Sequence, residues 1–247
     1  MRFTDTHSHL YDEAFTGEED NAVARAVEAG VTNVVIFEKS GIPGGCFATA
    51  YGGFNNTGSQ TIANWGTGKY AYCGDWQGAP EKMGDMASLV DEIHKIGMKV
   101  ILWYSVSFMG VYTEKFKEFE GMFLEGSGDD KTFFGLDPRY KKVREYLVGI
   151  YKKAVTDWKL DGLKLDFIDS FVLKGKSLEY DEKRDYQSLE EAIHVLMTDV
   201  RNTLTSINPD ILIEFRQSYV GPSIRKYGNM LRVGDCPCDI LKNRIGI

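Results

Sequence analysis

The sequence lacks any apolar run long enough to cross a membrane, and its first residues lack the apolar segment of a signal peptide. Cysteine is scarce, because four scattered residues in a chain of 247 are too few for a disulfide framework. Basic residues are also in deficit, with a net charge of −7, which argues against a partner held through nucleic-acid phosphates. We therefore expect a cytoplasmic protein with reduced thiols and with neither a nucleic-acid nor a membrane partner.

The composition is that of a globular protein with a sizeable core. Its length fits one large domain, and 43% of the residues are hydrophobic. Aromatic residues make up 13% of the chain. Aromatic rings suit sugar recognition, although core packing accounts for most aromatic residues in most proteins.

Short apolar runs alternate with amphipathic segments along the chain, a pattern that predicts an α/β fold with a parallel sheet or barrel. Helices are expected at Thr16–Gly30, at Met86–Gly97, from Asp137-Pro138 onward, and from the capping box Ser188–Glu191 onward. The six candidate strands are Arg2–Thr6, Thr32–Phe37, Lys99–Tyr104, Gly162–Phe167, Ile211–Phe215 and Met230–Val233.

These elements predict a single (β/α) TIM-type barrel over residues 1–247 that is incomplete, because a closed barrel needs eight strands. Residues 1–40 form a first βα unit, residues 41–73 an irregular junction rich in Gly, Asn and Thr, and residues 74–247 the main barrel segment. An open sheet edge can pair with another chain, so we expect a possible oligomer through that edge.

A lysine and an aspartate lie two residues apart at the end of the fourth candidate strand. Side chains alternate along a strand, so Lys164 and Asp166 project to the same side. A cation beside a carboxylate keeps it ionised, and an ionised, positioned aspartate is what a covalent glycosidase uses as its nucleophile. The alternative is a structural ion pair at the rim of a barrel.

From about residue 74 onward the chain resembles the melibiase-type α-galactosidases. The matching pieces, in the order of that family, are Gly74-Asp75-Trp76, Leu89–Tyr104, Leu136–Pro138, Gly162–Asp166 and Met230–Asp235. The resemblance implies a retaining glycoside hydrolase that acts on terminal α-galactosides by double displacement and needs no cofactor. It places the nucleophile at Asp166, the acid/base at Asp235, and sugar contacts at Asp75, Trp76, Trp103, Lys164 and Arg232.

Several of these residues also have a purely structural interpretation. Trp103 fits a core position, and Asp75 fits a turn. Glu214 and Arg216 share a strand face and could pair with each other, and Asp169 fits a helix cap.

One departure from the α-galactosidase pattern bears on activity. That family carries an aspartate pair that binds the galactose hydroxyls, but here no Asp or Glu occurs between Glu38 and Asp75. Each lost charge-assisted hydrogen bond costs roughly 1.5–3 kcal/mol of sugar binding. A catalytically inactive barrel fragment is therefore a further hypothesis.

The first forty residues resemble instead the start of a TatD-type metal-dependent hydrolase, on the segment Asp5–Leu10 and on Glu28–Val31. His7 and His9 would place two imidazoles on one face of a strand end, the beginning of a divalent metal site. This resemblance implies, as an alternative function, a metal-dependent nuclease or esterase. The other two histidines, His94 and His194, fit solvated or hydrogen-bonded positions on amphipathic helices.

Overall fold

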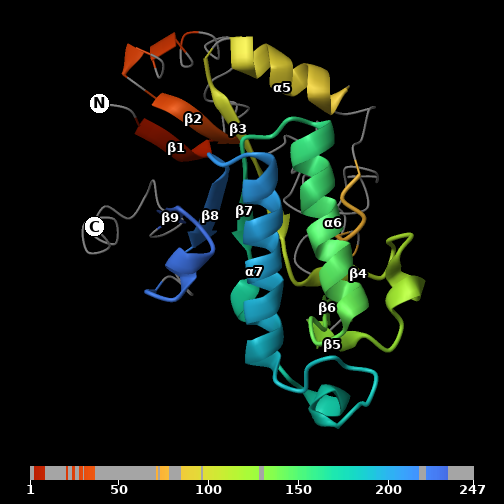
Figure 1. Cartoon of the computed structure of the whole chain (residues 1–247). Coiled ribbons are helices and arrows are strands. Elements are labelled where there is room, and N and C mark those ends of the chain that lie inside the picture. The colour runs from red at the N-terminus through yellow and green to blue at the C-terminus, as the bar shows by residue number, and fades with distance from the viewer. Residues whose placement is uncertain are drawn as a thin grey trace, which may run out of the picture.

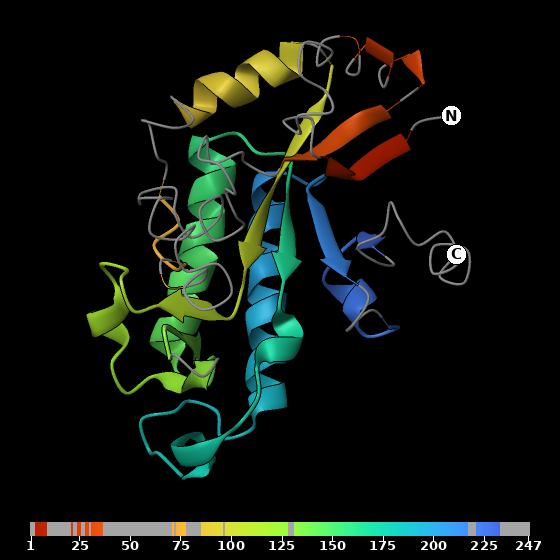
Figure 2. The ribbon, with the colours of Figure 1, turned by 180° about the vertical axis from the view of Figure 1, so that it is seen from behind.

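The computed structural model describes residues 3–8, 21, 24–25, 28–29, 31–36, 71, 73–77, 85–95, 97–127, 131–216 and 221–232. They form a mixed α/β fold with a six-stranded parallel sheet (Figures 1 and 2). Most of the junction 41–73 lies outside the described residues. Among the described residues, no helix combines the length and apolar character needed to cross a membrane.

The sheet contains all six predicted strands, in the order β1-β2-β3-β7-β8-β9. Its strands are β1 (Phe3–Ser8), β2 (Val31–Ile36), β3 (Lys99–Ser105), β7 (Gly162–Asp166), β8 (Leu212–Arg216) and β9 (Met230–Arg232). Their ends differ from the prediction by one or two residues. Among the described strands, β1 and β9 are the two edges, so closure into a barrel stays a prediction.

Helices α5 (Met86–Lys95), α6 (Lys141–Asp157) and α7 (Leu189–Ile207) lie near three of the four predicted segments, and most of the fourth, Thr16–Gly30, lies outside the described residues. In both views α6 and α7 run side by side along the sheet, and they contact each other (Figures 1 and 2). Helix α7 begins as predicted, because the Ser188 side chain accepts a hydrogen bond from the Glu191 backbone N–H. One apolar stripe of α7 is buried, at Leu196, Val200 and Leu204.

A second, antiparallel sheet was not predicted. Its strands are β4 (Phe108–Gly110), β5 (Phe123–Ser127) and β6 (Phe133–Leu136), in the order β4-β6-β5. Short 3₁₀ helices complete the connections, at η2 (Phe116–Phe119), η3 (Ile168–Ser170), η4 (Gly175–Leu178) and η6 (Ile224–Lys226). In both views the small sheet and η4 lie beyond the carboxyl end of β7 (Figures 1 and 2).

The prediction that α6 begins at Asp137-Pro138 was wrong, because α6 begins at Lys141 and Asp137 has a different role. The Asp137 carboxylate is 0% exposed and accepts hydrogen bonds from Arg139 Nε and Nη2 at 2.9 and 2.7 Å. Arg184 Nε lies 3.4 Å from the same carboxylate. Arg139 Nη2 also donates to the Ser177 carbonyl at 2.7 Å. This buried ionic cluster ties the segment before α6 to the long β7–α7 connection.

A second contact between the same two segments is sensitive to pH. The Tyr140 hydroxyl donates to Asp181 Oδ2 at 2.6 Å, which lowers the pKa of Asp181 below its ordinary value of 3.8, and the Lys183 backbone N–H acts in the same direction. A carboxyl group whose pKa is lowered by folding stabilises the folded state above pH 3.8. This contribution is lost as the pH falls through the lower pKa of the folded state.

We therefore expect Tyr140→Phe to be less stable than the wild type at neutral pH, with a difference that shrinks as pH falls below 3.8. Urea unfolding followed by circular dichroism over this pH range measures the difference. In an Asp181→Asn background, which cannot titrate at this position, the pH dependence of the difference should disappear. A difference that stays constant with pH would contradict the assignment.

Candidate active site

Asp166 is the last residue of β7 and lies at the carboxyl end of the sheet, where parallel α/β folds place their binding sites. Its side chain is almost buried, at 6% exposure for the residue. Trp103 Nε1 donates to Oδ2 at 2.9 Å, and the Phe167 backbone N–H donates to Oδ1 at 2.8 Å. The Arg216 guanidinium contacts Oδ1 through Nε. Two hydrogen-bond donors and one ionic contact therefore hold this carboxylate in a defined orientation.

The cation that contacts Asp166 differs from the prediction. We expected Lys164 beside Asp166, but Lys164 Nζ lies 3.6 Å from Glu214 Oε1, and both side chains of this pair are buried. Arg216 makes the contact with Asp166 instead. The alternative in which Glu214 and Arg216 pair with each other is also wrong, because each of them pairs with a residue on β7.

The register of β7 against β8 explains this exchange of partners. Lys164 pairs with Glu214 in the sheet, so Asp166, two residues further on, comes level with Arg216. The pairing depends on a close approach at the first residue of β7. A Cβ atom on Gly162 would lie 2.2 Å from the Leu212 carbonyl oxygen, so only glycine fits there.

Asp169 has a different environment from the predicted helix cap. It lies inside η3, and its Oδ1 atom is 3.4 Å from Arg216 Nη2. Arg216 therefore lies between two carboxylates, Asp166 and Asp169, and its guanidinium is 4.8 Å from the Phe167 ring centroid. This arrangement restricts Arg216 to one orientation.

Aromatic residues form one side of the site. The ring centroid of Trp103 lies 6.2 Å from that of Trp76 and 6.0 Å from that of Phe167. Both Trp76 and Phe167 have positive φ angles, 52° and 60°, which are uncommon for residues other than glycine. Such backbone strain persists only where the surroundings enforce it, and it concentrates at functional sites. In both cases the strained residue directly follows an aspartate, Asp75 or Asp166.

The sequence left open whether Trp103 and Asp75 are structural residues or sugar contacts, and the structure shows a structural contact for each. Trp103 is buried in the core, and it also donates its indole N–H to Asp166. Asp75 accepts hydrogen bonds from the backbone N–H groups of Glu114 and Lys115 at 2.8 and 3.1 Å. Asp75 therefore organises the loop before η2, and a sugar contact by Asp75, Trp76 or Lys164 stays a prediction.

Neutral tyrosines lie behind the site. Burial raises the pKa of Tyr104 and of Tyr151 well above the ordinary value, so both stay protonated at physiological pH. Burial likewise raises the pKa of Tyr146, whose hydroxyl donates to the Gly74 carbonyl at 2.8 Å. The ring of Tyr104 packs 4.8 Å from that of Trp76. These tyrosines support the aromatic side of the site without adding charge to it.

Four predicted site residues cannot be located as side chains. Asp235 and His9 lie outside the described residues, and the side chains of Arg232 in β9 and His7 in β1 are also outside them. The separation of the Asp166 and Asp235 carboxyls therefore stays a prediction. The described residues contain no group of three or more His, Cys, Asp or Glu side chains that could hold a metal ion.

The other two histidines have hydrogen-bond partners, as one of the two interpretations predicted. His94 Nε2 lies 2.7 Å from Asp161 Oδ2, which also accepts from the Val100 backbone N–H at 2.8 Å. His194 Nδ1 contacts the Tyr227 hydroxyl. Both histidines therefore support the packing of the helices.

No protein-family model matches the chain, and no curated protein matches it. Solved structures of α-galactosidases have a similar fold. The α-galactosidase from Lactobacillus brevis matches with a TM-score of 0.65 and 16% identity, over 100% of this chain and 31% of that one. A second match is the GH36 α-galactosidase AgaA from Geobacillus stearothermophilus, solved as a variant in complex with raffinose. Its TM-score is 0.68 and its identity 15%, over 100% of this chain and 32% of that one.

A third match is AgaB from Geobacillus stearothermophilus, with a TM-score of 0.61 and 15% identity, over 92% of this chain and 29% of that one. The chain thus spans about a third of the length of these enzymes. These comparisons do not support the resemblance of residues 1–40 to TatD-type hydrolases. At such identities the likeness shows that this chain shares a fold with part of the GH36 α-galactosidases.

Proposed function

We propose that the chain carries the catalytic centre of a retaining glycoside hydrolase that acts on terminal α-galactosides, with Asp166 as the nucleophile. The observation that carries this proposal is the Asp166 carboxylate, which Trp103, Phe167 and Arg216 hold at the carboxyl end of β7. The likeness in fold to α-galactosidases supports the choice of substrate. Arg216 and Trp103 are the residues that hold the nucleophile in place.

The proposed reaction has two displacements at the anomeric carbon. In the first, an Asp166 carboxylate oxygen forms a bond to that carbon while the bond to the leaving oxygen breaks, and Asp235 gives a proton to the leaving oxygen. In the second, Asp235 takes a proton from water, the water oxygen bonds to the anomeric carbon, and Asp166 leaves. Both inversions occur at the same carbon, so the product keeps the α configuration.

The sharpest test follows the stereochemistry of the product. The purified chain, incubated with nitrophenyl α-galactoside, should release nitrophenol, and proton NMR at early times should detect α-galactose before mutarotation. Addition of a chelator should leave the rate unchanged. Early release of β-galactose would exclude the double displacement, and a nuclease or esterase activity that needs a divalent metal would favour the TatD-type alternative with His7 and His9.

A further inference from the structure

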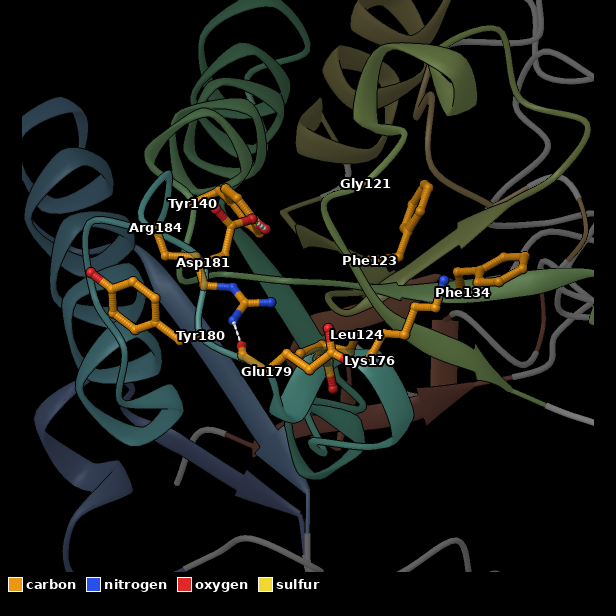
Figure 3. A pocket seen from close by; sticks show the side chains of 11 residues that line it. Gly121, Phe123, Leu124, Phe134, Tyr140, Lys176, Glu179, Tyr180, Asp181 and Arg184 are labelled. Carbon is orange, nitrogen blue, oxygen red and sulfur yellow. Dashed lines mark hydrogen bonds between the residues drawn. The ribbon is translucent and has the colours of Figure 1, made fainter.

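A pocket of about 400 Å³ lies between the small antiparallel sheet and the η4 segment (Figure 3). Phe123, Leu124 and Phe134 line it from the small sheet, and Lys176, Glu179 and Arg184 line it from the β7–α7 connection. None of the described residues that contact Asp166 lines this pocket. It is therefore separate from the candidate active site, although the small sheet and η4 lie beyond the carboxyl end of β7, the end at which Asp166 lies (Figures 1 and 2).

One wall of the pocket is aromatic. The ring centroids of Phe123 and Phe134 lie 5.4 Å apart, and Phe116 stacks against Phe123 at 4.8 Å with an interplanar angle of 20°. Phe123 and Phe134 are only partly buried, so they offer apolar surface to the pocket. An apolar wall with a few polar groups opposite it is typical of small-molecule sites.

Arg184 provides a buried donor at the opposite wall. The residue is 9% exposed, its Nε atom pairs with Asp137, and its Nη1 atom donates to the Glu179 carbonyl. The guanidinium also lies over the Tyr140 ring, 5.5 Å from its centroid, and interacts with the Tyr140 hydroxyl. Figure 3 shows the guanidinium pointing from the side of Tyr140 toward Leu124, across the pocket. A ligand oxygen that reaches this group would gain a charge-assisted hydrogen bond.

The charges that the described residues place around the pocket are balanced. Lys176 and Arg184 supply two cations, and Glu179 and Asp181 supply two carboxylates. Both oxygens of Asp181 are already engaged, by the Tyr140 hydroxyl and by the Lys183 backbone N–H. An anionic ligand would meet repulsion from the carboxylates, whereas a hydroxyl group can accept from Arg184 or Lys176 and donate to Glu179.

We propose that this pocket is a second binding site for a neutral saccharide unit, with one sugar face on Phe123 and Phe134 and its hydroxyls on Lys176, Glu179 and Arg184. The sugar class rests on the proposed function. An oligosaccharide substrate would then contact the protein at a place remote from the bond that is cleaved.

Calorimetric titration of raffinose into the Asp166→Asn chain tests this site without turnover. A Lys176→Ala/Glu179→Gln double variant in that background should weaken raffinose binding about tenfold or more, through the loss of charge-assisted hydrogen bonds. Both side chains are exposed, so the variant should fold normally, which circular dichroism can check. The matched control is Glu182→Gln/Lys183→Ala, two exposed residues of the same connection that do not line the pocket, and it should bind as the background does.

Equal raffinose affinity in the two double variants would overturn the proposal. Displacement of raffinose by inorganic phosphate, with phosphate binding lost in Lys176→Ala, would overturn it in favour of an anion site. The hydrolysis assay separates this inference from the proposed function. Raffinose binding that depends on Lys176 and Glu179 would support the pocket as a binding site, even if the wild-type chain hydrolysed no galactoside. Hydrolysis of the galactoside, together with raffinose binding that does not depend on Lys176 and Glu179, would support only the proposed function.

Discussion

Asp166→Asn should lower the rate of α-galactoside hydrolysis by roughly 10⁴-fold or more, because an amide cannot displace the leaving group. The substitution keeps the size of the side chain. An asparagine oxygen can still accept from the Phe167 backbone N–H, the contact that Asp166 Oδ1 now makes at 2.8 Å. The unfolding free energy should therefore change much less than the rate. Initial rates with nitrophenyl α-galactoside, together with urea unfolding of the same preparation, measure both effects.

The matched control is Asp199→Asn, which removes an exposed carboxylate from α7 and should leave the rate unchanged. Chemical rescue adds a second criterion. In Asp166→Gly, added azide should restore turnover and form a β-galactosyl azide, because azide attacks the face from which the carboxylate acted. Full activity in Asp166→Asn, or an azide product with the α configuration, would rule out Asp166 as the nucleophile.

Asp137→Ala should destabilise the fold by about 3–5 kcal/mol, because it leaves two buried arginines without their shared carboxylate. Asp137 is 0% exposed and holds Arg139 and Arg184 together. Urea unfolding measures the change. Asp199→Ala, at an exposed position, should stay within about 0.5 kcal/mol of the wild type.

The same substitution should disturb the pocket more than the candidate active site. Without Asp137, Arg184 loses the contact that orients its guanidinium, whereas the residues that contact Asp166 come from β3, β8 and the end of β7. If Asp137→Ala unfolds at the same urea concentration as the wild type, the cluster contributes little, and the arginines must find other partners.

The sequence alone was sufficient to predict the main sheet. Its six strands are apolar runs between amphipathic segments, and a parallel strand buried on both faces depends mainly on such local composition. The start of α7 could also be predicted, because the Ser188 side chain caps the backbone N–H of Glu191, only three residues away. Interactions over such short distances along the chain leave a recognisable pattern.

The small antiparallel sheet left no such pattern. Strand β4 has three residues and β6 has four, too few to show a period of two. Asp137-Pro138 has the sequence pattern of a helix start, yet the Asp137 carboxylate pairs with the buried Arg139 and Arg184 side chains. Arg184 lies far along the chain, so no local motif indicated this contact.

The sequence by itself therefore determined the six strands, helices α5 and α7, and Asp166 as the carboxylate at a strand end. Only the tertiary structure decided that Arg216 contacts Asp166, that Lys164 pairs with Glu214, and that Trp103 donates to Asp166. The physical reason is register. Residue spacing sets which side of one strand a side chain occupies, but the alignment of β7 with β3 and β8 sets which side chains meet.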